Sequence, residues 1–158
     1  YAEKASPDMK IRVLSVGKKH EPWVEPGVVR FLERLRPPFV AEMDIIPGSS
    51  REGDRARTEE SERLLKRLKQ DDFVILLDER GNNLSSPELA ALLQGQGDRQ
   101  VVIIIGGAFG VTPELRQRAD VVWSLSRLVF PHQLVRLILA EQLYRAQEIT
   151  RGGQYHHE

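Results

Sequence analysis

Short apolar runs alternate along the chain with longer amphipathic segments. Five runs have the length and the β-branched content of strands, at residues 11–16, 39–46, 73–77, 101–105 and 120–125. The runs at 73–77 and 101–105 are unbroken, as is typical of parallel strands covered on both faces, so we expect them at the centre of a sheet. Helical spacing or helix-start signals fall between the runs, at residues 23–35, 58–69, 86–93, from 112 onward and 133–149. This alternation predicts an α/β fold with a mostly parallel sheet and helices on both faces.

Local signals fix several boundaries. Ser86 followed by Pro87 predicts a cap and the first position of a helix, and Thr112 with Pro113 repeats the device. Residues 47–53 are polar and contain glycine, which predicts a mobile loop before the charged helix. Residues 1–8 precede Met9, and we expect them to be a tag or a disordered extension in front of a single domain over residues 9–158.

Composition narrows the possible chemistry. The 158 residues suit one globular domain, and the count of zero cysteines excludes a disulfide framework, a thiolate zinc site and a cysteine nucleophile. No apolar run approaches the roughly 20 residues that span a bilayer, so we expect a cytoplasmic protein without a membrane partner. Lysine and arginine total 23 against 23 aspartate and glutamate residues. Any nucleic-acid binding would therefore depend on local basic patches.

Two loops at the predicted carboxyl ends of strands carry candidate chemistry, because ligands of parallel sheets bind there. Residues 77–83 place two carboxylates and an arginine beside Gly81, although a solvated turn has the same composition. Residues 106–110 follow the most apolar strand and contain three glycines, which permit close approach of a ligand to the backbone. Their spacing is not G-x-G-x-x-G, and a tight turn without a ligand is the alternative.

The third loop and the last helix are unusually apolar. Residues 124–132 contain Leu128, Val129 and Phe130 in what should be an exposed connection, so we expect a ligand or a partner segment to cover them. His132 ends this loop, where it is either a packed histidine or a titratable participant in catalysis. The helix over 133–149 is apolar on nearly all sides, which favours burial against a second subunit over a central position in a monomer.

Several motifs, taken in their order along the chain, resemble those of one protein family. They are Leu77-Asp78-Glu79-Arg80-Gly81, Ile105-Gly106-Gly107-x-x-Gly110, Leu125-Ser126 with Phe130-Pro131-His132, Leu137 through Tyr144-Arg145-Ala146, and Tyr155-His156. The chain is similar, from about Lys10 to Glu158, to the bacterial large-subunit ribosomal RNA methyltransferases that methylate N3 of a pseudouridine. These enzymes are members of the SPOUT class of trefoil-knotted methyltransferases.

The resemblance implies a fold, a cofactor and partners. It implies a C-terminal trefoil knot, S-adenosylmethionine bound by the knotted loops, and a homodimer whose second subunit completes the site. The substrate would be 23S ribosomal RNA, within the ribosome or its large subunit, and no metal would be needed. By position, the family's cofactor loops match Leu77, Gly106, Gly107, Gly110, Ser126, Arg127, Leu128, Val129, Phe130 and Pro131.

Methyl transfer to a ring nitrogen requires alignment of the reactants and removal of the N3 proton. The polar candidates for catalysis are His132, Glu141, Arg145, Tyr155 and His156. The family's tail often has a fixed cation after the Tyr-His pair, whereas this chain has His157, which is mostly neutral near pH 7. Tyr155 and His156 are expected to be ordered by RNA or by the partner subunit, the alternative being a frayed end.

Two rival functions belong to other classes. One is a ribosome-binding or assembly protein that kept the fold and lost the chemistry, and the other is an α/β enzyme acting on a free nucleotide. Basic residues that could meet RNA phosphates, or form only a solvated face, are Lys18, Lys19, Arg63, Lys66, Arg67 and Lys69.

Overall fold

The computed structural model describes residues 8–156, so the expectation for residues 1–7 lies outside the described part of the chain. The strands are β1 (Met9–Val16), β2 (Phe39–Ile46), β3 (Phe73–Asn83), β4 (Val101–Ile105) and β5 (Val121–Ser124). The helices are α1 (Glu25–Glu33), α2 (Gly53–Leu65), α3 (Ser86–Gln94), α4 (Pro113–Arg118) and α5 (His132–Thr150). The predicted alternation of strands and helices is confirmed.

The five strands form one parallel sheet in the order β2-β1-β4-β3-β5. At its centre, Val13 of β1 is in register with Met43 of β2 and with Ile103 of β4. All five residues of β4 are buried, as expected for a strand covered on both faces.

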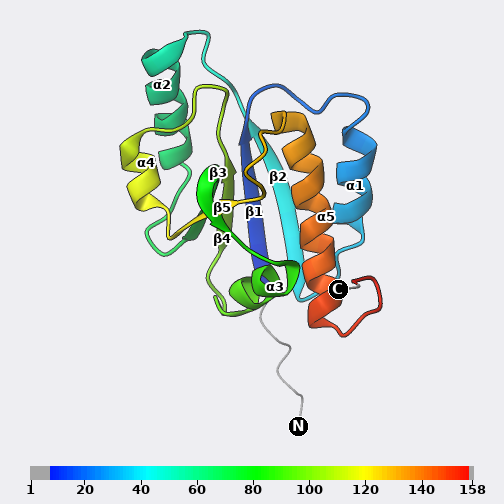
Figure 1. The fold of residues 1–158 in the computed structure, drawn as a ribbon. Helices are drawn as coiled ribbons and strands as arrows, with labels where there is room; N and C mark the ends of the chain where they lie inside the picture. The colour runs from blue at the N-terminus through cyan, green and yellow to red at the C-terminus, as the bar shows by residue number, and fades with distance from the viewer. Residues whose placement is uncertain (1–7, 157–158) are drawn as a thin grey trace.

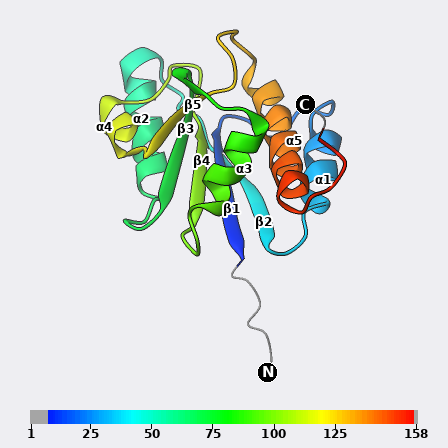
Figure 2. The same ribbon diagram turned by 60° about the horizontal axis from the view of Figure 1, so that its bottom comes forward.

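Helices cover both faces of this sheet (Figures 1 and 2). On one face, α1, α3 and α5 pack together, and Leu139 and Leu143 of α5 join the same core cluster as Val13. On the other face, Leu64 of α2 and Leu115 of α4 pack against strand residues such as Leu14. Each fully buried leucine contributes roughly 1.5–3 kcal/mol to folding.

After β5, at the edge of the sheet, the chain returns toward the centre of the sheet. This strand lies at the edge, beside β3, whereas α5 packs against α1, α3 and the central strand β4. Residues 125–131 therefore cross the carboxyl ends of the central strands before α5 begins, and α5 then runs down the molecule to the C-terminal segment (Figure 1).

Several predicted boundaries need correction. The polar segment around Gly53 is the first turn of α2 rather than part of a mobile loop, because Ala56, Glu60 and Leu64 form a buried stripe at helical spacing. The cap of α3 is Ser85 rather than Ser86, and it makes a capping box with Glu88. Strand β3 continues to Asn83, past an irregularity, because its end pairs with β5.

Helix α5 also differs from the expectation of an apolar surface all round. Arg136 and Gln147 are buried within it, and Leu134 and Ile138 are only half-buried. Gln147 joins α5 to the end of α1 by accepting a hydrogen bond from the Arg36 N–H (2.6 Å) and donating to the Arg34 carbonyl (3.2 Å). Across residues 8–156, none of the helices has the length and apolar character needed to cross a membrane.

Candidate functional site

The irregular part of β3 and the connections that follow β4 and β5 surround one cavity of about 500 Å³. A cavity of this size suits a small-molecule ligand. Its lining combines apolar side chains with the backbone of the glycine-rich loop. The lining residues are Leu76, Leu77, Asp78, Glu79, Arg80, Ile105, Gly106, Gly107, Ala108, Gly110, Val111, Trp123, Leu125, Ser126, Leu128, Val129, Phe130, His132 and Val135.

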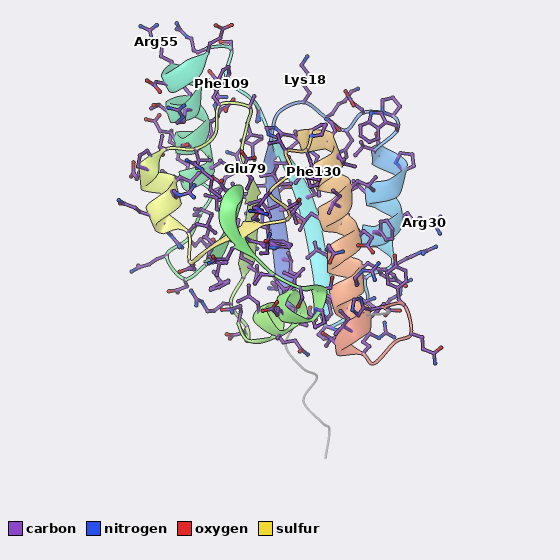
Figure 3. All side chains as sticks on the ribbon, in the orientation of Figure 1. Lys18, Arg30, Arg55, Glu79, Phe109 and Phe130 are labelled. Carbon is purple, nitrogen blue, oxygen red and sulfur yellow. The ribbon has the colours of Figure 1, made fainter. Side chains whose placement is uncertain are left out.

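Most of the residues predicted to bind a cofactor are brought together here. Leu77, the three glycines, Ser126 and residues 128–130 all line the cavity. Arg127 and Pro131 belong to the same crossing segment but are not among the lining residues. Figure 3 shows Glu79 and Phe130 near the middle of this region.

The glycine-rich loop over 106–110 is a tight turn held by α2. The Gly110 N–H donates to the Gly107 carbonyl (3.1 Å), and Gly110 has φ of +78°, a conformation that favours glycine. Arg57 Nε donates to the Phe109 carbonyl (2.9 Å), and the Thr112 N–H donates to Ser61 Oγ (2.9 Å). The C-terminal side of the loop is therefore anchored to α2.

Position 107 needs glycine because the Glu60 side chain packs against it from behind the cavity wall. A Cβ atom at this position would collide with Oε1 of Glu60 and lie 3.2 Å from Val16 Cγ1. The absence of a side chain thus lets the buried Glu60 carboxylate lie directly behind the loop. The sequence suggested only that this glycine makes room for a ligand.

Asp78 is the most strongly perturbed carboxyl group of the cavity. Burial raises its pKa, but hydrogen bonds from Arg80 and Arg116 outweigh that effect and bring the pKa to about 2. Arg116 Nη1 lies 2.6 Å from Asp78 Oδ2 and belongs to α4. The cavity therefore has a negative charge within β3 that neighbouring guanidinium groups compensate.

The crossing segment supplies the outer wall of the cavity. The Leu128 N–H donates to Ser126 Oγ (3.0 Å), which shapes a turn. Leu128 and Val129 line the cavity yet are 69% and 76% exposed within the single chain. The expected cover for these apolar side chains therefore does not come from residues 8–156 of the same chain.

His132 lines the cavity as the first residue of α5. Burial lowers its pKa, the positive charge of Arg136 lowers it further, and Glu60 opposes both effects. The imidazole is consequently biased toward its neutral form, which can accept a proton. Of the five predicted catalytic residues, His132 is the one beside the cavity.

The other four form a separate cluster at the far end of α5. Arg145 Nε donates to Glu141 Oε1 (2.9 Å), as does the Tyr155 hydroxyl (3.2 Å), and Arg145 Nη1 lies 3.1 Å from His156 Nδ1. The Arg145 guanidinium lies over the Tyr155 ring, 4.8 Å from its centroid. Burial, followed by Glu141, raises the pKa of Tyr155. Residues 154–156 are thus docked on α5 of their own chain.

The two groups are too far apart to act on one atom within a single chain. Val135 lines the cavity and Arg145 lies ten residues further along α5, about 15 Å at the helical rise of 1.5 Å per residue.

Sequence reasoning missed several residues of the site. Trp123, Leu125 and Val135 line the cavity, and the buried indole N–H of Trp123 has no acceptor among residues 8–156. Alternation in β5 could have identified Trp123 as buried, but not which cavity it faces. Glu60 could not be singled out from the sequence, because most of the residues around it in α2 are also charged.

Comparisons with known proteins cover nearly the whole chain. The family described as "Predicted SPOUT methyltransferase" matches residues 9–156. "Ribosomal RNA large subunit methyltransferase H" of Geobacter metallireducens is 45% identical over 155 residues, covering 94% of this chain and 99% of that protein. The proteins of the same name from Synechococcus sp. (strain RCC307) and Symbiobacterium thermophilum are 45% and 41% identical, covering 93% and 94% of this chain and 94% and 99% of their own lengths.

Proposed function

The chain belongs to the SPOUT methyltransferase family, and from that premise we propose that it methylates N3 of a pseudouridine in large-subunit ribosomal RNA. The α/β sheet with a C-terminal trefoil knot, which the resemblance implied, is the fold of this family. Knots are almost absent from proteins. The hydrophobic periodicity and motif spacing of the sequence gave no sign of one. The single observation that carries the proposal is the cavity lined by the three segments that match the family's cofactor loops.

The cavity residues fit S-adenosylmethionine, the cofactor of this family. Apolar walls at Leu77, Leu125 and Phe130 suit an adenine ring, and the glycine-rich loop exposes backbone donors and acceptors to polar groups. When bound, S-adenosylmethionine would supply an electrophilic sulfonium methyl group for transfer to N3. The protein's own part is to hold the reactants in line, exclude water and accept the N3 proton.

The active unit that we propose is a homodimer with one composite site per cavity. Glu141, Arg145, Tyr155 and His156 would reach the cavity of the partner subunit, because about 15 Å separates them from their own. A second subunit would also cover Leu128 and Val129, which are exposed in the single chain. The cofactor-binding and catalytic assignments of the individual residues are part of this proposal.

RNA would approach over the end of the molecule that carries the loop after β1. Gln133 Nε2 donates to the Lys19 carbonyl (3.2 Å), and Arg136 Nη1 donates to the Lys18 carbonyl (2.8 Å), so α5 fixes this basic loop beside the cavity. Lys18 projects away from the body of the molecule in Figure 3, at the same end as Arg55. Contacts with phosphates position RNA without reading its sequence. An enzyme that acts on ribosomal RNA would be located in the cytoplasm.

Mass spectrometry of ribosomal RNA from a strain lacking the protein tests the reaction. We expect the loss of one methyl group on one pseudouridine of the large-subunit RNA, restored by the wild-type gene. Unchanged methylation would refute the proposal. Calorimetry separates the rivals: S-adenosylmethionine binds in the proposed enzyme, whereas a non-catalytic assembly protein binds none and an enzyme of free nucleotides binds ATP or NAD.

A further inference from the structure

Glu60 is a buried carboxylate with unused hydrogen-bonding capacity. It lies on α2, is 5% exposed, and accepts a hydrogen bond from the Ser49 N–H at Oε2 (2.9 Å). Its Oε1 is buried and has no hydrogen-bond partner within residues 8–156. In that part of the chain, no lysine or arginine lies within ion-pair distance of it. A buried polar atom without a hydrogen-bond partner is costly, which points to a role beyond folding.

The unpartnered oxygen is directed toward the glycine-rich loop at the cavity wall. Oε1 lies where a Cβ of Gly107 would be, and Gly107 lines the cavity. Glu60 Oε2 also lies against Gly48, which is next to Gly17, and Gly17 in turn adjoins Arg136 Nη2. Glycines therefore clear the space between Glu60 on α2 and the first turns of α5.

His132 occupies the first turn of α5 and lines the same cavity. Burial, the Arg136 charge and the N-terminus of a 19-residue helix all disfavour a protonated imidazole there. Arg136 itself is 1% exposed and fixed by Ser15 Oγ (2.7 Å), so its charge cannot move away. Asp78, Glu79 and Arg80 line the β3 side of the cavity, and Glu60 is the group whose charge opposes that of Arg136 at His132.

We propose that His132 takes the N3 proton of the target base, and that Glu60 is a positioning residue that stabilises the resulting imidazolium from behind Gly107. The inference rests on the proposed function and adds its proton acceptor. The N3–H bond breaks, its electron pair stays on nitrogen for the new bond to carbon, and the proton on His132 later passes to water. A buried carboxylate that supports a histidine base in this way is a recurrent arrangement in enzymes.

Nuclear magnetic resonance of the protein without RNA tests the pair directly. Protein labelled with ¹⁵N-histidine contains four imidazoles, and His132→Gln identifies the signal of His132. Glu60→Gln keeps an acceptor for Ser49 but removes the charge, so we expect the His132 titration midpoint to move to lower pH. Glu60→Asp should restore part of the shift.

Glu59→Gln is the matched control, because Glu59 is the preceding residue of α2 but points to Ser49 Oγ (2.6 Å) and Arg63 (3.7 Å). It should leave the His132 titration unchanged. An identical His132 midpoint in wild type and Glu60→Gln, or an equal shift in Glu59→Gln, would overturn the pairing.

Single-turnover methylation as a function of pH tests the catalytic part. We expect His132→Gln to slow the reaction by about 100-fold or more and to remove the lower limb of the profile. In Glu60→Gln that limb should move to lower pH with a lower plateau, while the affinity for S-adenosylmethionine stays within about twofold. An unshifted profile in Glu60→Gln would refute the role of Glu60. A wild-type protein that methylates no ribosomal RNA would refute the proposed function instead, and the titration would still report on the pair.

Discussion

Gly107 lies between the cavity and the carboxylate of Glu60, so a side chain there has two consequences. From the sequence alone, valine at this position should weaken cofactor binding far more than folding. The collision with Glu60 adds a second effect, since a buried carboxylate would have to move. We now predict that Gly107→Val lowers both the affinity and the stability, the latter by about 1–3 kcal/mol.

Thermal melts and calorimetry of Gly107→Val measure the two effects separately. Ala108→Val is the control for stability, because Ala108 is the exposed neighbour. A melting temperature equal to that of the wild type would show that Glu60 moves away without cost.

Asp78 predicts a pH-dependent contribution to stability. Its pKa falls from 3.8 to about 2 on folding, so the ionised form is stabilised in the folded state. The contribution is present above pH 3.8 and is lost as the pH falls toward 2. We expect Asp78→Asn to lose roughly 1 kcal/mol at pH 7, a modest value because Arg80 is exposed to water.

Urea denaturation at pH 7 and at about pH 2.5 compares the wild type with Asp78→Asn. The difference in unfolding free energy should narrow at the lower pH. A difference that stays constant would mean that the ion pairs of Asp78 add nothing to stability.

Among the elements, those defined by continuous apolar runs were predictable from the sequence. Strand β2 has the predicted bounds, and the core of β4 does as well. Helix α2 was placed five residues late because its buried stripe contains Glu60, which a hydrophobic pattern cannot identify. The glycine-rich loop and the crossing segment were recognised as candidate binding loops by composition. Glu60 and Trp123 were not, since their positions depend on packing between segments that are distant along the chain.

The docked C-terminal segment gives a prediction at this scale. Tyr155 packs edge-on against Tyr144 and under Arg145, which shows that the segment over 154–156 is held by α5 rather than frayed. His157, where the family often has a cation, lies outside the described residues. Deletion of residues 154–158 should leave dimerisation and cofactor affinity intact and nearly abolish methylation.

Tyr155→Phe tests one group of this segment, and a partial loss of methylation is expected if the hydroxyl takes part in catalysis. It keeps the ring against Tyr144 and removes only the hydroxyl that donates to Glu141. Full activity of the truncated chain, measured by methyl transfer to ribosomes, would show that Tyr155 and His156 have no part in catalysis.

At the scale of the whole molecule, a composite site predicts a particular pattern of complementation. Light scattering should report twice the mass of the 18.0 kDa chain. A chain with a blocked cavity, Gly107→Val, and a chain lacking residues 154–158 should each be inactive alone. Mixed and refolded together, they should recover about one quarter of the wild-type activity, because half of the dimers are mixed and each contains one intact site.

The control is to refold each variant with itself, which should give dimers without activity. Absence of recovery in the mixture, despite exchange of subunits, would place the cavity and the tail of one chain in the same site.

The crossing segment over 125–131 closes the cavity late in the sequence, and this has a consequence during protein synthesis. Residues that come first in the chain leave the ribosome first, so β1 to β4 emerge before the third wall of the cavity exists. A ligand stabilises only the conformation that binds it, by about 2.7 kcal/mol at a concentration 100 times its Kd. Cellular S-adenosylmethionine would therefore protect complete chains from proteases, whereas nascent chains, which lack the third wall, would gain no such stabilisation.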